Sequence, residues 1–349
     1  MTPASRSITI QHERITESER GVMGSNHQSA NGQLAADVGE TAGLLERLRK
    51  NIAEVLFGKP DLIRLSLIAV LAEGHILVED MPGVGKTLLA KALARSLNCT
   101  FHRIQFTPDL LPSDLIGTSV FQQQTGTFVF QPGPLFAQVV LADEINRATP
   151  RTQSALLEAM SDHQVSVDGV TRPLGPPFLV LATQNPFEFE GTYPLPESQL
   201  DRFLMRLQIG YPDRQAEREI LVTHREGEPV DRLGTVLTAD QVVSLQLMVR
   251  KVRVEDSLTG YLLDVINGTR TQSEIALGAS PRAALGLYRA AQASALLEGR
   301  DFVIPDDIKR LAIPVLSHRL LTHSLRQGGR DATAASIIEG ILERTPVPA

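Results

Sequence analysis

The segment Met81–Thr87 reads Met-Pro-Gly-Val-Gly-Lys-Thr, and it constrains the fold of this chain more than any other segment. It follows an apolar run, His75–Glu79, and precedes a helical pattern over Leu88–Leu97. A strand, a glycine-rich turn, Lys-Thr and a helix form the context of a loop that binds phosphate groups. Main-chain N–H groups of such a turn point at the phosphates, and the helix N-terminus adds positive potential. The segment therefore predicts an α/β domain with a phosphate site at the end of a core strand.

Lys86 is expected to neutralise phosphate oxygens, and the hydroxyl of Thr87 is expected to ligate Mg²⁺. The general motif G-x-x-x-x-G-K-[ST] has a glycine where this chain has Asp80. Because Asp adopts positive φ more readily than most residues, we expect the turn to survive, with the carboxylate directed away from the phosphates. A chance Gly-Lys-Thr in a surface loop is the alternative interpretation, and the flanking strand and helix argue against it. The predicted nucleotide contacts are Gly83, Val84, Gly85, Lys86, Thr87 and Leu88.

The composition narrows the class of protein. The chain has 349 residues, which suggests two or three domains. Its net charge of −6 does not favour non-specific binding to nucleic acid. The single cysteine, Cys99, cannot form an internal disulfide, and we find neither a signal region nor an apolar run of about 18 residues. A cytoplasmic protein without membrane insertion is expected.

The chain divides into three predicted parts. Residues 1–38 have few large apolar side chains and no sustained periodicity, so they read as a disordered tail. Residues 39–212 contain apolar runs that do not alternate with polar residues and are separated by helical patterns, which predicts a parallel sheet covered on both faces. These runs are His75–Glu79, Phe101–Phe106, Val139–Ala142, Phe178–Ala182 and Phe203–Ile209. Helical patterns dominate residues 213–349, which predicts a smaller all-helical domain.

Two segments interrupt the α/β plan. Val120–Phe130 alternates around Gln-Thr-Gly-Thr, and Val165–Pro177 contains Asp168-Gly169, which is a hairpin turn signal. Both are predicted to be β-hairpins that project from the core.

Two acids follow the apolar run Val139–Ala142. Asp143 is expected to lie beside the Mg²⁺, and Glu144 is expected to act as the base that polarises the attacking water. The next run ends in Thr183-Gln184-Asn185, and adjacent parallel strands share the edge where ligands bind. We therefore expect Asn185 to position water near the γ-phosphate, with Thr183 as the second choice.

Two arginines are candidates for stabilising transition-state charge. Arg202 precedes the last core strand and could reach the γ-phosphate of a neighbouring subunit. Arg282 lies in the first turn of a helix with Ser280 as N-cap, where a cation opposes the helix dipole. This placement suggests another partner, such as a nucleotide phosphate held between the two domains. Competing candidates for the role in a neighbouring site are Arg147, Arg151 and Arg206.

Taken together, the motifs resemble the AAA+ ATPases and, more closely, the MoxR family, over about residues 39–345. The segments that carry the resemblance are Glu79–Thr87, Leu141–Ala148, Thr152–Met160, Thr183–Glu197, Gln199–Phe203 and Gly278–Ala283. The resemblance implies ATP and Mg²⁺ as cofactors. It places Lys86 and its neighbours on Walker A, Asp143 and Glu144 on Walker B, Asn185 on sensor 1, Arg202 on the arginine finger and Arg282 on sensor 2. It further implies that Val120–Phe130 is the helix-2 insert, that Val165–Pro177 is the pre-sensor-1 hairpin, that residues 213–349 are the lid, and that Gly58 lies near the adenine.

Members of this family are expected to assemble as homo-oligomeric rings, typically hexamers, and to remodel or activate partners that carry von Willebrand factor A domains. The resemblance therefore implies an ATPase with a chaperone-like function. Three alternatives remain open: the ATPase subunit of a metal-chelatase complex, a nucleic-acid-dependent motor, and an adaptor that binds ATP without turnover. The hairpins argue against the motor, because Val120–Phe130 has no basic residue and Val165–Pro177 has only Arg172.

Overall fold

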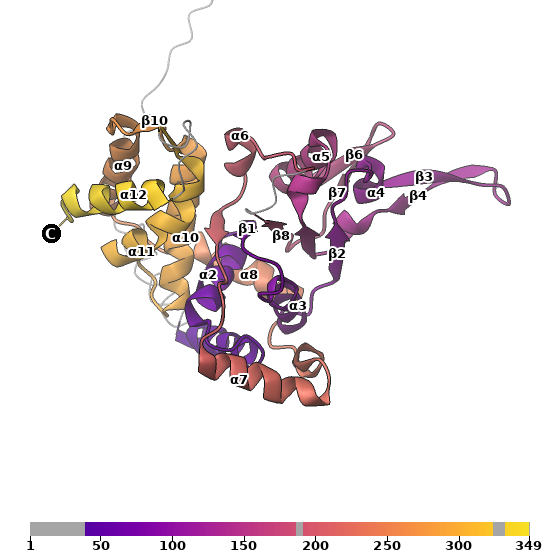
Figure 1. Cartoon of the computed structure of the whole chain (residues 1–349), viewed down its shortest axis with the longest axis horizontal. Coiled ribbons are helices and arrows are strands. Elements are labelled where there is room, and N and C mark those ends of the chain that lie inside the picture. The colour runs from indigo at the N-terminus through magenta and orange to yellow at the C-terminus, as the bar shows by residue number, and fades with distance from the viewer. Residues whose placement is uncertain (1–38, 186–190, 324–331, 349) are drawn as a thin grey trace, which may run out of the picture.

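The computed structural model describes residues 39–185, 191–323 and 332–348 (Figure 1). The predicted tail over residues 1–38 lies outside the described residues. Five parallel strands form a central sheet in the order β2-β5-β8-β1-β9, which confirms the predicted fold class. The strands are β1 (Ile76–Glu79), β2 (Phe101–Gln105), β5 (Val139–Asp143), β8 (Leu179–Gln184) and β9 (Met205–Leu207).

Both faces of the sheet are covered, which explains why its strands read as continuous apolar runs. In β5, Val139 and Leu141 join one buried cluster, whereas Val140 and Ala142 join the other. The first cluster includes side chains of the helix over residues 39–53, of α2 (Pro60–Leu71) and of α3 (Lys86–Ser96). Helices α4 (Pro112–Ile116) and α5 (Pro150–Asp162) cover the opposite face.

Two hairpins lie outside the central sheet, as the sequence predicts. One consists of β3 (Gly117–Gln122) and β4 (Thr127–Pro132), and it extends far from the sheet in Figure 1. The other consists of β6 (Gln164–Val167) and β7 (Val170–Pro173). Short helices connect the elements of this region: η1 (Pro134–Phe136), η2 (Ile145–Arg147) and α6 (Glu197–Leu200).

The C-terminal part of the chain is helical. Its elements are α7 (Arg214–Thr223), η3 (His224–Glu226), η4 (Pro229–Arg232), α8 (Ala239–Val249), α9 (Asp256–Thr271), α10 (Pro281–Leu297), α11 (Pro305–Leu316), η5 (Ser317–Arg319) and α12 (Ala332–Arg344). A short antiparallel pair, β10 (Ile275–Leu277) with β11 (Leu321–Thr322), adds a small β element that the sequence pattern does not reveal. Buried side chains of the helical part, of α2 and of the sheet belong to one cluster, so α2 connects the helical part to the sheet. None of the helices in the described ranges has the length and apolar content needed to cross a membrane.

A buried histidine joins three elements of the core. The Nε2–H of His75 donates to the carbonyl oxygen of Met160 at 3.0 Å, and the N–H of Val180 donates to Nδ1 at 3.1 Å. These two bonds connect the start of β1 to α5 and β8, and they require the neutral imidazole with its proton on Nε2. Burial lowers the pKa of His75 to about 4, because a charged ring would lose its hydration.

This histidine predicts a specific pH dependence of stability. The unfolded chain binds a proton at His75 below about pH 6.5, whereas the folded chain does so only near pH 4. The contribution of neutral His75 to the free energy of unfolding is therefore fully present above about pH 6.5 and decreases as the pH falls toward 4. The free energy of unfolding, measured with urea at several pH values, should lose about 1 kcal/mol per pH unit more in the wild type than in His75→Gln between pH 6.5 and 5. The exposed residue His323 provides the control, and His323→Gln should leave the wild-type slope unchanged. Equal slopes in wild type and His75→Gln would contradict the assignment.

Candidate nucleotide-binding site

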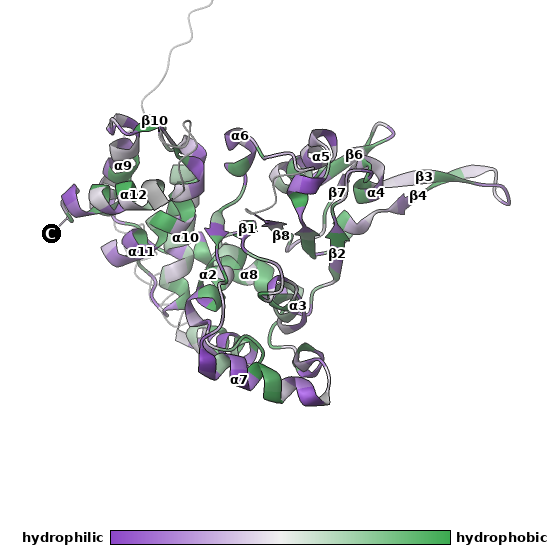
Figure 2. Cartoon of the chain, in the orientation of Figure 1, coloured by the Kyte–Doolittle hydropathy of each residue, from purple (hydrophilic) through white to green (hydrophobic). Residues whose placement is uncertain are grey.

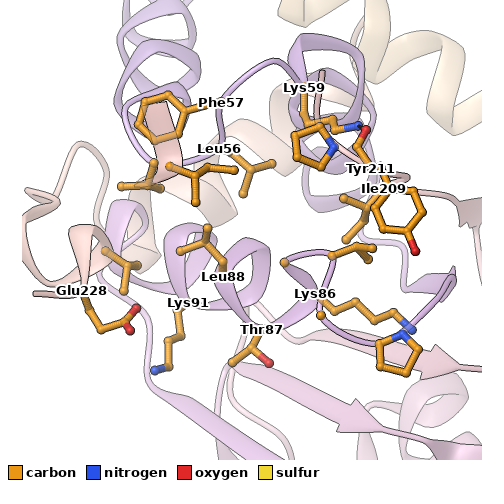
Figure 3. Close-up of a pocket in the computed structure, with 18 of the residues that line it drawn as sticks. Leu56, Phe57, Lys59, Lys86, Thr87, Leu88, Lys91, Ile209, Tyr211 and Glu228 are labelled. Carbon is orange, nitrogen blue, oxygen red and sulfur yellow. Dashed lines mark hydrogen bonds between the residues drawn. The ribbon is translucent and has the colours of Figure 1, made fainter. Parts of the chain in front are cut away.

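A cavity of about 740 Å³ opens at the carboxyl ends of the central strands, within the size range of ligand sites in proteins. The phosphate loop and the start of α3 form its floor, and residues from the N-terminal helical region and from α7 form its other walls. Figure 3 shows Leu56, Phe57 and Leu88 gathered on one side and Lys86 with Tyr211 on the other. The cavity therefore has an end rich in apolar side chains, where Lys91 and Glu228 also lie, and an end that contains Lys86; we call them the apolar end and the polar end.

The polar end begins with the phosphate loop. Gly83 and Gly85 adopt φ of 83° and 102°, and a Cβ atom added at either glycine would meet nothing within 4 Å. Gly85 is also the N-cap of α3, so the first N–H groups of that helix face the cavity end without side-chain caps. This geometry suits an anion, because backbone donors and the helix dipole act together.

Lys86 lies at the same end. Its ammonium donates to the carbonyl oxygen of Asp80 and, at 3.4 Å, to that of Gln184. Burial lowers the pKa of Lys86, and the negative charges of Asp80, Asp143 and Glu144 oppose this shift. Lys86 is thus a cation surrounded by acceptors, and a phosphate would give it a better partner than two carbonyls.

Asp80 shows that one expectation from the sequence was wrong. It is not among the residues with positive φ, so it does not imitate a glycine. Its carboxylate is instead buried, with Asp80 only 8% exposed, and accepts hydrogen bonds from the N–H groups of Met81 (2.8 Å), Ile209 (2.7 Å) and Gly210 (2.6 Å). The carboxylate points away from the cavity, as expected, and Asp80 does not line it.

The two predicted acids lie at the end of β5 and line the cavity. Thr183 of the adjacent strand β8 donates from its hydroxyl to Asp143 Oδ1 at 2.6 Å and accepts from the N–H of Glu144 at 2.8 Å. Glu144 adopts the left-handed conformation, with φ of 60°. Such a conformation costs a non-glycine residue roughly 1 kcal/mol and is frequent at functional sites.

Three polar side chains surround these acids; the sequence interpretation missed Arg103 and Gln105 and considered Arg147 only for a role in a neighbouring site. Arg103 pairs with Asp143 at 2.6 Å, Gln105 donates to Glu144 at 2.7 Å, and Arg147 pairs with Glu144 at 3.1 Å. Arg103 and Gln105 both belong to β2, the edge strand of the sheet. The available signal was the placement of Arg103 and Gln105 two positions apart in this strand, which puts both side chains on the same face of the sheet.

Asn185 follows β8 directly and lines the cavity beside the acids. It is buried, with 7% of its surface exposed, which suits a fixed polar group. Thr183 is completely buried, and its hydroxyl group is hydrogen-bonded to the carboxylate of Asp143 and to the N–H of Glu144. Of the two residues considered for positioning water, Asn185 is therefore the one that faces the cavity.

The apolar end of the cavity could enclose a flat ring. The apolar side chains that line it include Leu56, Phe57, Leu88, Ile220, Leu221 and Val230. Gly58 does not itself line the cavity, although both of its neighbours do. It has φ of 68°, and a Cβ atom at this position would come within 2.9 Å of Ala216 Cβ, so the glycine allows α7 to approach.

The structure separates the two candidate arginines from this cavity. Arg202 and Arg282 line a second hollow of about 340 Å³, together with Arg289 and Arg319, and the two cavities share no lining residue. We call this second site the arginine hollow. Arg202 donates from Nη1 to Leu157 O and Ser161 Oγ, both at 2.6 Å. Arg282 therefore does not line the nucleotide cavity of its own chain in this structure, and its role at a bound phosphate stays a prediction.

Asp201 organises the arginine hollow. Its carboxylate accepts from the hydroxyl of Ser280 at 3.0 and 3.1 Å, and Ser280 in turn caps α10 by accepting from the N–H of Ala283. The guanidinium of Arg319 lies 3.6 Å from the same carboxylate and donates to Phe203 O at 2.6 Å. Its Nη1 is buried without a hydrogen-bond partner in the described part of the chain. Burial lowers the pKa of Arg319 to about 10, and Asp201 opposes this shift.

The other arginine candidates have different surroundings. Arg147 pairs with Glu144 of its own chain, and Arg206 lies between Glu79 (3.1 Å) and Ser317 (3.3 Å). Arg151 is exposed in the first turn of α5. Arg202 is the candidate that shares a concave site with further arginines.

The cavity residues fit Mg-ATP. Residues Gly83–Thr87 would hold the phosphates, Thr87 and Asp143 would hold the metal, and the apolar end would enclose the base. The open space beside Gly83 and Gly85 leaves room for phosphate oxygens next to the main chain.

Comparisons with known proteins agree with this site. Residues 75–205 match the family described as "ATPase family associated with various cellular activities (AAA)", and residues 267–341 match "AAA lid domain". The chain is 48% identical to uncharacterized protein YeaC of Bacillus subtilis, over 87% of this chain and 95% of that protein. It is 44% identical to chaperone MoxR1 of Mycobacterium tuberculosis, over 79% and 75% of the two chains. A crystal structure of a protein of Cytophaga hutchinsonii, assigned as an ATPase, superposes with a TM-score of 0.83 at 37% identity and covers 93% of this chain and 99% of that one.

The position of Glu144 predicts separate effects on binding and turnover. An amide cannot accept a proton from water, so Glu144→Gln should lower ATP turnover by about 10²- to 10⁴-fold. Its affinity for a fluorescent ADP analogue should stay within about threefold of wild type, because Glu144 holds no phosphate. Glu158→Gln, at an exposed position of α5, is the matched control and should preserve both quantities. Equal turnover in Glu144→Gln and wild type would remove Glu144 from the role of base.

Proposed function

This chain belongs to the MoxR family of AAA+ ATPases, and from this premise we propose that it couples Mg-ATP hydrolysis in a ring of identical subunits to the remodelling of a partner protein. The proposal rests on one observation above all: Arg202 and Arg282 line a hollow separate from the nucleotide cavity of their own chain. A phosphoryl-transfer site needs cations around the developing charge. A second subunit that presents its arginine hollow to the cavity would supply them.

Each chain supplies the groups that begin hydrolysis. In this mechanism Lys86 would compensate phosphate charge, Thr87 and Asp143 would hold Mg²⁺, Glu144 would polarise water, and Asn185 would orient it. When bound, Mg²⁺ neutralises charge on the phosphates. The ion pairs of Arg103 with Asp143 and of Arg147 with Glu144 must then loosen, because both carboxylates acquire new partners.

The neighbouring subunit would complete the site. Arg202 and Arg282 would approach the γ-phosphate together, because Asp201 next to Arg202 is hydrogen-bonded to Ser280 near Arg282. Arg319 and Arg289 would raise the positive potential of the same surface. A homo-oligomeric ring, in our proposal a hexamer, provides one such interface for every cavity.

The work done by hydrolysis is proposed to act on a protein. The name of the M. tuberculosis relative, chaperone MoxR1, supports a chaperone-like activity. We propose a client with a von Willebrand factor A domain, and the cytoplasm as the compartment that supplies ATP. The moving parts would be residues 39–212 and residues 213–349, with the hairpins transmitting motion to the client.

A nucleic-acid motor is less well supported. Arg172, the one basic residue predicted in the second hairpin, stacks on the ring of Phe130 with 3.9 Å between the guanidinium carbon and the ring centroid. The hairpin of β3 and β4 contains no charged residue from Gly117 to Pro132 and exposes Phe121 and Phe128. A surface of this kind offers no partner for phosphate groups, whereas it suits contact with protein.

Mixed assemblies test the shared site. Arg202→Ala and Lys86→Ala subunits should each be inactive alone, because one lacks the finger and the other lacks the phosphate-binding lysine. In a random equimolar mixture, half of the cavities are intact and half of these meet an intact arginine, so turnover should recover to about a quarter of wild type. The matched control is a mixture of Lys86→Ala subunits with Arg310→Ala subunits, because Arg310 is an exposed arginine of α11.

The control variant should be fully active alone, so the recovery would be specific to the arginine hollow. Stable mixed rings without recovered turnover would show that Arg202 does not act between subunits. Turnover in a dilute, monomeric wild type equal to that of the assembled protein would contradict the ring itself.

A further inference from the structure

The carboxylate of Asp80 joins the start of the phosphate loop to Ile209 and Gly210, which follow Asp80 by 129 and 130 positions in the sequence. On one side it accepts from Met81 N, at the start of the phosphate loop. On the other side one oxygen, Oδ2, accepts from both Ile209 N and Gly210 N, just after β9. Hydrogen bonds to an ionised acceptor are about twice as strong as neutral ones, so this link is strong for its size.

The segment after β9 continues directly to α7. Lys59 donates to Tyr211 O at 2.8 Å, and the Tyr211 hydroxyl donates to Met81 Sδ at 3.3 Å. Asp213 then caps α7 by accepting from the N–H of Ala216 at 2.8 Å. A continuous set of contacts therefore runs from the phosphate loop through Asp80 and Tyr211 to the first turn of α7.

Helix α7 has an exposed position over the cavity. Ile220 and Leu221 line the apolar end of the nucleotide cavity, yet Leu221 and Val222 are 71% and 50% exposed. Figure 2 shows apolar and polar stretches along this helix. The position of α7 therefore depends more on the contacts at its two ends than on burial of its apolar side chains. The hydrogen bonds of Asp80 to Ile209 and Gly210 lie shortly before its N-terminal end.

We propose that Asp80 is a positioning residue that couples phosphate binding at the loop to the placement of α7 over the base. The inference rests on the proposed nucleotide-binding function and extends it, because it assigns a role to the residue that replaces the first glycine of the general motif. A glycine has no acceptor for Ile209 N and Gly210 N. In this chain the phosphate loop and the base-covering helix move as one unit.

Hydrogen exchange of the full chain tests the link in two arms. Without nucleotide, the amides of Ile209 and Gly210 should exchange at least about tenfold faster in Asp80→Gly than in wild type, because their acceptor is gone. With saturating Mg-ADP, wild type should gain protection over residues 83–88 and over residues 209–223. Asp80→Gly should still gain protection over residues 83–88 but should lose most of the gain over residues 209–223.

Two further variants sharpen the test. Asp80→Asn keeps one acceptor oxygen and loses the other, so its nucleotide-dependent protection over residues 209–223 should be intermediate. Asp61→Asn makes the same chemical change at an exposed position in the first turn of α2, and it should behave as wild type.

The outcomes separate the inference from the proposed function. Failure of wild type to bind Mg-ADP would contradict the proposed function, whereas the nucleotide-free arm would still report on the Asp80 hydrogen bonds. Binding by wild type with full protection of residues 209–223 in both Asp80 variants would overturn the coupling. Loss of folding in both Asp80 variants would also overturn it, because Asp80 would then support the domain as a whole.

Discussion

The carboxyl end of strand β1 is the point on which the rest of the site depends. Val78 pairs with Thr183 of β8 on one side and with Leu207 of β9 on the other, and β1 is buried on both faces. The phosphate loop therefore starts from a strand that is held by a neighbouring strand on each side and by packing on both faces. The same parallel arrangement brings Asp143, Asn185 and the segment after β9 to the walls of one cavity. The proposed phosphate binding, metal binding and water activation would thus all depend on one sheet edge.

In the proposed mechanism, this sheet edge alone is an incomplete site. Its acids pair with Arg103 and Arg147, whereas Arg202 and Arg282 lie in the arginine hollow. Asp201, next to Arg202, is hydrogen-bonded to Ser280, which caps α10 near Arg282. The two arginines are therefore held together on one surface, which a neighbouring subunit would contact in the proposed ring. In the proposed ring, charge compensation between subunits would make turnover dependent on assembly, and assembly would then control when ATP is consumed.

Much of the fold could be predicted because continuous apolar runs report burial on both faces, and the phosphate loop and its acids are local patterns. The remaining features depend on residues far apart in the sequence. Nothing near Asp80 indicates that Ile209 and Gly210 are its partners, and the expected positive φ was wrong because these donors give the carboxylate another role. Likewise, Gly58 is required by the approach of Ala216, and the separation of Arg282 from the cavity follows from how α10 packs on α2.

The central claim is that the catalytic site is shared between subunits. The most direct measurement is ATP turnover per subunit as a function of protein concentration, with the assembly state recorded by analytical ultracentrifugation under the same conditions. The account predicts that turnover per subunit rises in parallel with the fraction of assembled protein and that the monomer is nearly inactive, by about 10³-fold, as expected for a missing arginine finger. A monomer with the same turnover per subunit as the assembled protein would contradict it.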